Sequence, residues 1–109
     1  MRRPLIPVAA CLAFLGCAEL QQGADATART AARATVDEVL VTRFPGVDGT
    51  RVTPYTNCVI DNASASEIAN LARAAVTGVN DATVSLITGM IQRPDISACL
   101  LRAGLAPMT

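Results

Sequence analysis

The chain has 109 residues, of which 51% are hydrophobic and 3% aromatic, and its nine arginines balance its nine acidic residues. This length suits a single domain, and scattered arginines with so few aromatic rings argue against a nucleic-acid partner. Because the sequence contains no lysine and no histidine, it also excludes phosphate-binding loops that need a lysine and catalytic pairs that use histidine.

Residues 1–16 have the pattern of a cleaved secretory signal peptide. Arg2 and Arg3 supply positive charge, residues 5–15 are mostly apolar, and polar residues begin at Glu19. The apolar run is shorter than the roughly 20 residues that a membrane-spanning helix needs. We therefore expect export, and the mature chain then keeps seven arginines against nine acidic residues, a net charge of −2.

The end of this leader, Phe14-Leu15-Gly16-Cys17, resembles the lipobox of bacterial lipoproteins. In that motif a small residue precedes a cysteine, which becomes the first mature residue and carries the lipid anchor. Phe14 departs from the motif, in which leucine is usual at this position. The resemblance implies lipidation at Cys17, a polar tether over residues 17–24, and the periplasmic face of the outer membrane. The alternative is cleavage after Ala18, which would give a soluble periplasmic protein.

Residues 25–109 are predicted to form one all-α domain, a small bundle of four to five short helices. Residues 25–44 carry apolar side chains at every fourth position, which places them on one face of a helix. On another face, Arg33 and Asp37 lie one turn apart, where they can form an ion pair. We expect this helix to cover the bundle or to serve in part as a stalk from the membrane.

A loop, or a short β-ribbon, is expected to follow over residues 46–52, with a turn at Asp48-Gly49. Thr53 is predicted to cap the second helix, with Pro54 in its first turn. The inward face of this helix should carry four residues: Tyr55, Cys58, Val59 and Asn62.

Capping residues mark three further helix starts. Ser64 and Glu67 match a capping box, Asn80 caps the next helix, and Asp95 begins the last one after Pro94. The expected inward faces are, in turn, Ile68, Leu71, Ala72, Ala75, Val76 and Val79; Val84, Ile87, Met90 and Ile91; and Ile96, Cys99, Leu100 and Ala103.

Three glycines are predicted to shape these helices. Gly78 and Gly104 should end theirs in the left-handed conformation, and Leu105 should fold back onto the last turn. Gly89 lies inside a helix, where it lowers helix stability by about 1 kcal/mol relative to alanine. We expect it to let a neighbouring helix approach closely.

Cys58 and Cys99 are predicted to form a disulfide, because exported cysteines meet an oxidising compartment and both lie on inward helix faces. Closing a loop of about 40 residues stabilises by roughly 4 kcal/mol in the chain-entropy account. Redox-active pairs usually follow a Cys-x-x-Cys pattern and zinc sites usually recruit four ligands, so neither fits this pair. We expect no metal and no cofactor.

One carboxylate pair, Asp61 and Glu67, flanks a helix junction and is the only candidate catalytic arrangement in the sequence. A hydrolase built on this pair is one alternative function. Because the capping box already accounts for Glu67, we predict that the protein is not an enzyme.

Several segments resemble small exported proteins of alphaproteobacteria: Phe44-Pro45-Gly46, Asn57-Cys58-Val59-Ile60-Asp61-Asn62-Ala63, Glu67-Ile68, and Arg93-Pro94 before Cys99. The resemblance implies no established activity. The sequence thus predicts a small envelope lipoprotein with a binding or structural role, whose partners are the membrane, through the lipid anchor, and an envelope protein. A periplasmic chaperone of the acid-stress type is the alternative, by analogy of architecture alone.

Overall fold

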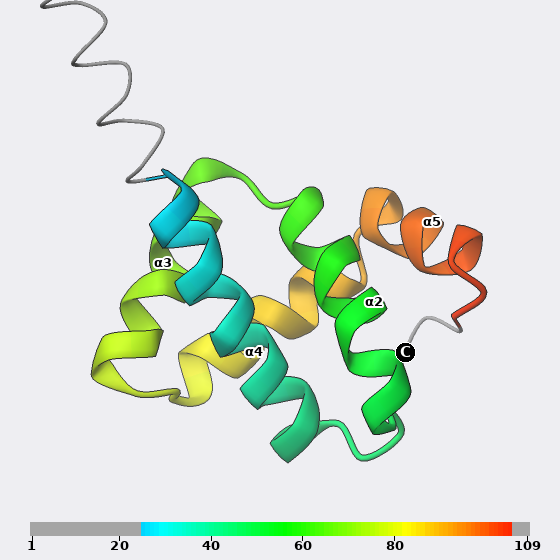
Figure 1. Ribbon diagram of the computed structural model, residues 1–109, viewed down its shortest axis with the longest axis horizontal. Helices are drawn as coiled ribbons and strands as arrows, with labels where there is room; N and C mark the ends of the chain where they lie inside the picture. Colours follow the sequence, from blue (N-terminus) through cyan, green and yellow to red (C-terminus); the bar gives the residue numbers. More distant parts are fainter. Residues whose placement is uncertain (1–24, 106–109) are drawn as a thin grey trace, which may run out of the picture.

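The computed structural model describes residues 25–105, and these are helical without any β-strand (Figure 1). The helix over residues 25–43 is followed by four others: α2 (Gly49–Asp61), α3 (Ala65–Thr77), α4 (Asp81–Ile91) and α5 (Pro94–Arg102). The predicted all-α bundle is thereby confirmed, and the alternative of a β-ribbon is wrong. The predicted signal peptide, the lipidation site Cys17, the tether and residues 106–109 lie outside the described residues.

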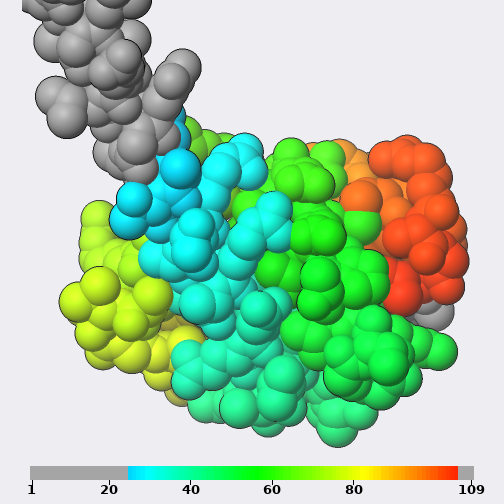
Figure 2. All heavy atoms as spheres, in the orientation of Figure 1, coloured from blue at the N-terminus to red at the C-terminus, as the bar shows by residue number. Residues whose placement is uncertain are grey.

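The N-terminal helix, residues 25–43, lies across the bundle, and on one face its side chains sit between those of α3 and α2 (Figure 2). Four of its apolar side chains are fully buried: Ala32, Val36, Val39 and Leu40. The buried Thr35 hydroxyl also donates a hydrogen bond to the Leu71 carbonyl of α3, at 2.7 Å. These residues therefore form part of the core and not a stalk.

The ion pair that the sequence permits between Arg33 and Asp37 does not form, because both side chains find partners on α2. The Arg33 guanidinium donates to the Asn57 amide oxygen and lies 3.6 Å from an Asp61 carboxylate oxygen. The Asp37 carboxylate accepts a hydrogen bond from the Thr56 hydroxyl. Because α2 packs against the N-terminal helix, Arg33 and Asp37 each contact α2 and do not form an ion pair with each other.

Helix α2 begins earlier than predicted. Its N-cap is Asp48, whose carboxylate accepts from the Thr50 backbone N–H at 3.0 Å, so the helix starts at Gly49 and not after Thr53. Pro54 consequently lies inside the helix. The expected loop is correspondingly shorter, since aspartate is among the strongest capping residues and takes precedence over the proline signal.

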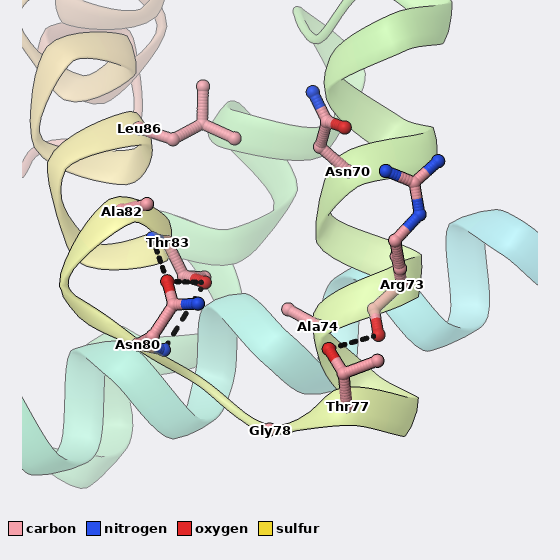
Figure 3. A pocket seen from close by; sticks show the side chains of 9 residues that line it. All are labelled: Asn70, Arg73, Ala74, Thr77, Gly78, Asn80, Ala82, Thr83 and Leu86. Atoms are coloured by element: carbon pink, nitrogen blue, oxygen red, sulfur yellow. Dashed lines mark hydrogen bonds between the residues drawn. The ribbon is translucent and has the colours of Figure 1, made fainter.

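The capping predictions for α3 and α4 are confirmed. The Ser64 hydroxyl accepts from the Glu67 backbone N–H, and the Glu67 carboxylate accepts from the Ser64 N–H at 2.8 Å. In the same way Asn80 and Thr83 bond each other's backbone at the start of α4 (Figure 3). Both helix starts are therefore fixed by pairs of residues three apart in the sequence.

The buried face of α3 differs from the predicted one in its last turns. Ile68, Leu71 and Ala74 are buried, whereas Ala75 is exposed and Val76 is 87% exposed. Ala74 and Val76 are two residues apart, about 200° around a helix, so they cannot face the same core. The prediction failed because several positions of α3 are alanine, which marks neither a buried nor an exposed face.

The last two helices bury most of the predicted residues, among them Ile87, Met90, Ile91, Ile96 and Leu100. Helix α5 begins at Pro94, one residue before the predicted start, and Ala103 is exposed.

Gly104 has a φ of +76° and ends α5, and the backbone N–H of Leu105 returns to the Leu100 carbonyl at 2.8 Å, as predicted. Gly78 also has a positive φ, +99°, but its ψ of 152° is extended and not left-handed helical. A Cβ built on Gly89 would meet nothing within 4 Å, so the predicted close approach of a neighbouring helix at that residue is wrong.

Candidate functional site

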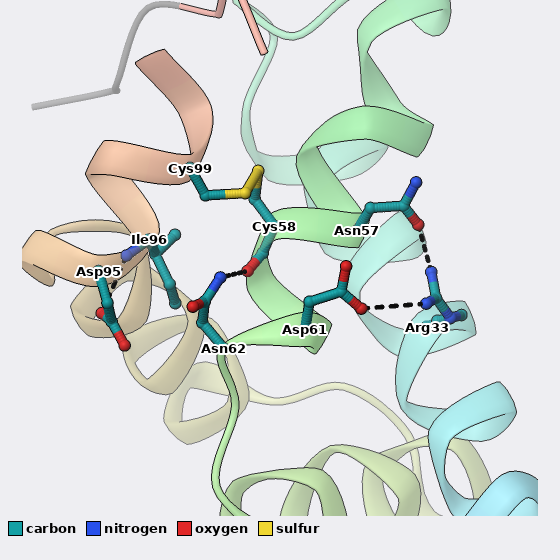
Figure 4. Close-up of a disulfide and its surroundings, with 8 residues drawn as sticks. All are labelled: Arg33, Asn57, Cys58, Asp61, Asn62, Asp95, Ile96 and Cys99. Atoms are coloured by element: carbon teal, nitrogen blue, oxygen red, sulfur yellow. Dashed lines mark hydrogen bonds and ion pairs between the residues drawn. A yellow bond between two sulfur atoms is a disulfide. The ribbon is translucent and has the colours of Figure 1, made fainter. Parts of the chain in front are cut away.

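The disulfide predicted between Cys58 of α2 and Cys99 of α5 is confirmed (Figure 4). The two Cα atoms lie 5.6 Å apart, and the bond spans 41 residues of sequence. Cys58 is 3% exposed and Cys99 is half-buried. At the end of α2, the Asn62 side-chain amide donates to the Cys58 carbonyl at 2.8 Å, which ties the helix terminus to the bridged residue.

Arg93, directly before α5, connects the ends of three helices. Its Nη1 lies 2.8 and 2.7 Å from the two carboxylate oxygens of Glu67 in α3, and its Nη2 donates to the Asn62 carbonyl at the end of α2, at 2.6 Å. It also pairs with Asp95 in the first turn of α5, at 3.3 Å. Arginine therefore serves here as an organiser of the helix ends and uses several of its N–H donors.

The Glu67 carboxyl is held in its charged form. Partial burial raises its pKa, but hydrogen bonds from the Ser64 backbone and from Arg93 outweigh that effect, so the pKa of Glu67 lies below its ordinary value. The same hydrogen bonds with Glu67 raise the pKa of Arg93. The pair is consequently a charged structural contact over the neutral pH range.

The structure gives Asp61 and Glu67 separate surroundings. Asp61 is paired with Arg33 and its side chain is 62% exposed, whereas the Glu67 side chain is 17% exposed and held by Ser64 and Arg93. The two carboxylates share no partner among the described residues. A catalytic carboxylate pair needs opposed groups in one enclosed site, and these contacts do not build one.

A groove of about 350 Å³ lies between α3 and α4 (Figure 3). Its α3 wall includes Asn70, Arg73 and Thr77, and its α4 wall includes Thr83 and Leu86. Of the residues that line it, the sequence singled out only Gly78, as a helix end, and Asn80, as a cap. No sequence motif marks Asn70 or Arg73, since they come together with α4 only through the packing of the two helices.

Within residues 25–105, no group of three or more potential ligands among His, Cys, Asp and Glu is arranged to hold a metal ion. In the same range no helix has the length and apolar character needed to cross a membrane. The Met90 side chain is 1% exposed and packs in the core, as the sequence suggested.

Comparisons with protein-family models, curated proteins and solved structures found no match to this chain. The resemblance to exported alphaproteobacterial proteins, the chaperone alternative and the expectation that the protein is not an enzyme therefore stay predictions.

Proposed function

We propose that the protein is a small envelope lipoprotein that binds or holds another envelope component, anchored at the periplasmic face of the outer membrane through a lipid on Cys17. The observation that carries the proposal is the disulfide between Cys58 and Cys99. Disulfides persist in oxidising compartments and are rare in the cytosol. A structural bridge of this kind therefore agrees with the apolar leader that precedes the domain.

The size of the domain supports the same reading. A chain this short buries a smaller fraction of its surface than a larger domain does, and this core is built mainly from medium-sized aliphatic side chains. Exported small domains commonly compensate for a limited core with disulfides. The bridge between α2 and α5 has that role here, because it links two helices distant in sequence.

The tether limits where a partner would lie. Residues 17–24 would span at most roughly 28 Å when fully extended, given about 3.5 Å per residue. The helical domain, which begins at Asp25, would then remain close to the membrane surface. A binding or structural role next to the membrane fits this geometry, and we place the envelope partner there.

Intact-mass and peptide mass spectrometry of the protein made with its own leader in a Gram-negative host tests the proposal. We expect an acylated Cys17 at the mature N-terminus, recovery in the outer-membrane fraction, and no free thiol at Cys58 or Cys99. A Cys17→Ser variant should lose acylation and leave that fraction. An unacylated product beginning at Glu19 would favour the soluble alternative, and an uncleaved chain with free thiols would overturn export itself.

A further inference from the structure

The groove between α3 and α4 holds two polar side chains without a partner among residues 25–105. Asn70 and Arg73 lie one turn apart on α3 and line the groove, and neither side chain has a hydrogen bond or ion pair to a described residue (Figure 3). Both residues are exposed, and Arg73, like Arg29, Arg43 and Arg102, has no ion pair within residues 25–105, whereas Arg33, Arg51 and Arg93 each pair with a carboxylate. A guanidinium and an amide are thus both available to a ligand in the groove.

Several other polar groups of the groove already have partners within the protein. The Asn80 side-chain oxygen accepts from the backbone N–H and the hydroxyl of Thr83, at 3.0 and 3.1 Å. The Thr77 hydroxyl donates to the Arg73 carbonyl at 3.1 Å. The Asn80 side-chain oxygen, the Thr83 hydroxyl and the Thr77 hydroxyl are thus occupied, and recognition of a ligand would come chiefly from the side chains of Asn70 and Arg73.

The remaining surface of the groove suits an apolar group. Ala74 is 6% exposed, Leu86 is half-buried, and Ala82 lies beside them on α4. The volume of about 350 Å³ falls at the lower end of the range for ligand pockets, about 300–1,000 Å³. Such a space holds one or two residues of a peptide and not a large cofactor.

We infer that this groove binds the C-terminal carboxylate of a partner polypeptide whose last residue is apolar. The planar guanidinium of Arg73 matches a carboxylate with two parallel hydrogen bonds, and the Asn70 amide adds a third donor. A single arginine balances the one charge of a carboxylate, whereas a phosphate monoester carries about −1.5 to −2. The inference deepens the proposed binding role and rests on it for the nature of the partner as an envelope protein.

The probe is the N-acetylated tetrapeptide Ala-Ala-Leu-Leu, with either a free carboxylate or a terminal amide, added to the isotope-labelled mature protein purified in detergent. We expect the acid to shift the NMR signals of the Arg73 side-chain N–H and the Asn70 amide, and to bind at least tenfold more tightly than the amide. Arg73→Gln should weaken binding of the acid at least tenfold. Ala82→Leu, which leaves Arg73 in place but fills the groove, should weaken it similarly.

Arg43→Gln is the matched control, because Arg43 is also exposed, ends the N-terminal helix and has no ion-pair partner among the described residues. It should leave binding unchanged. Equal binding of acid and amide, no binding of either, or equal effects of R73Q and R43Q would each overturn the inference. Displacement of the peptide by inorganic phosphate at lower concentration than by acetate would overturn it in favour of a phosphate site.

The same sample separates this inference from the proposed function. If mass spectrometry shows acylated Cys17 but the acid peptide has no advantage over the amide, only the groove assignment fails. If Cys17 is not acylated and the acid peptide still binds through Arg73, the anchor fails and the groove assignment stands. Because the acid and the amide are compared on the protein without any substitution, this comparison does not depend on the folding of a variant.

Discussion

Arg93 and Glu67 are joined by one guanidinium nitrogen that lies 2.8 and 2.7 Å from the two carboxylate oxygens. The same carboxylate accepts the Ser64 N–H and completes the capping box of α3. The Glu67 side chain thus caps the start of α3 and also holds Arg93, the residue directly before α5. The Asn62 carbonyl, bonded to the same arginine, brings the end of α2 into this contact.

Arg93→Ala should destabilise the protein by about 1–2 kcal/mol. Hydrogen bonds to charged groups contribute about 1.5–3 kcal/mol, and the lower value applies here because the Arg93 side chain is 34% exposed and solvent screens the pair. Urea unfolding followed by circular dichroism measures the loss. Arg43→Ala, a change at an arginine without an ion pair in the described part of the chain, should cost less than 0.5 kcal/mol. Equal losses in the two variants would contradict a structural role for Arg93.

The stability contributed by Glu67 should disappear in acid. Its pKa is lowered on folding because the hydrogen bonds from Ser64 and Arg93 outweigh burial, so this contribution is full above the ordinary pKa of 4.5 and is lost as the pH falls through the lowered value. Glu67→Gln keeps the shape of the cap but cannot ionise. We expect the melting temperatures of the native protein and E67Q to differ at pH 7 and to approach each other as the pH falls below 4.5.

Melting curves over this range, with a dye that reports exposed apolar surface, also test the chaperone alternative. A gain in dye binding and protection of an aggregating client on acidification would favour it. A protein indifferent to pH in both assays would speak against it. A difference between native protein and E67Q that stays constant down to pH 3 would contradict the role assigned to the charged carboxylate.

Loss of the disulfide should cost about 4 kcal/mol, the chain-entropy value for a bridge that spans 41 residues. That is a large share of the 5–15 kcal/mol typical of whole domains. The double variant Cys58→Ala with Cys99→Ala, compared with the oxidised protein in urea, measures it. A reductant should lower the urea midpoint of the native protein to about that of the double variant, and it should leave the midpoint of the double variant unchanged. A reductant that does not alter the native midpoint would contradict a stabilising bridge.

The features that sequence predicted best are local or follow from chemistry alone. The capping box at Ser64 and the cap at Asn80 involve partners three residues apart, so the sequence contains both groups, although the reciprocal bond from Thr83 was not predicted. The pairing of Cys58 and Cys99 follows from two cysteines in a domain expected to be exported. Neither prediction depends on knowing how one helix packs against another.

The contacts that sequence missed depend on that packing. Arg33 has an acidic neighbour one turn away, yet it contacts α2, because the bundle places Asn57 and Asp61 within its reach. No sequence pattern marked Arg73 or Asn70 as candidate binding residues. They become candidates only because α4 packs beside them and forms a groove, which helix periodicity does not predict.

Pro54 offers a test of where α2 begins. If the helix starts at Gly49, Pro54 lies in its interior, where it cannot donate to the Thr50 carbonyl. Pro54→Ala should then stabilise the protein by about 2–2.5 kcal/mol, since the helical gain of about 3 kcal/mol is reduced by the roughly 0.4–1 kcal/mol that the greater freedom of the unfolded chain costs. The measurement is urea unfolding, together with hydrogen exchange of the new N–H at residue 54.

A destabilised P54A variant would instead favour a helix capped by Thr53 and beginning at Pro54, because proline is favourable in the first helical position. Rapid exchange of the new N–H would point the same way. Thr53→Ala provides the matched control. If Thr53 were the N-cap, this change would lower the stability of the protein by about 1 kcal/mol. If Thr53 is an exposed residue inside the helix, the change should alter stability little or raise it slightly.

Two glycine-to-alanine changes should have opposite effects on stability although both sites have room for a methyl group. Gly89 lies inside α4 with nothing within 4 Å of an added Cβ, so Gly89→Ala should stabilise by about 1 kcal/mol through helix propensity. Gly104 is equally uncrowded, but its φ of +76° disfavours a side chain, and Gly104→Ala should destabilise by about 1–2 kcal/mol. Urea midpoints of the two variants provide the comparison. Because added volume is the same in both, opposite signs would assign the difference to backbone conformation, and a loss of stability in both would mean that Gly89 has a neighbour outside the described residues.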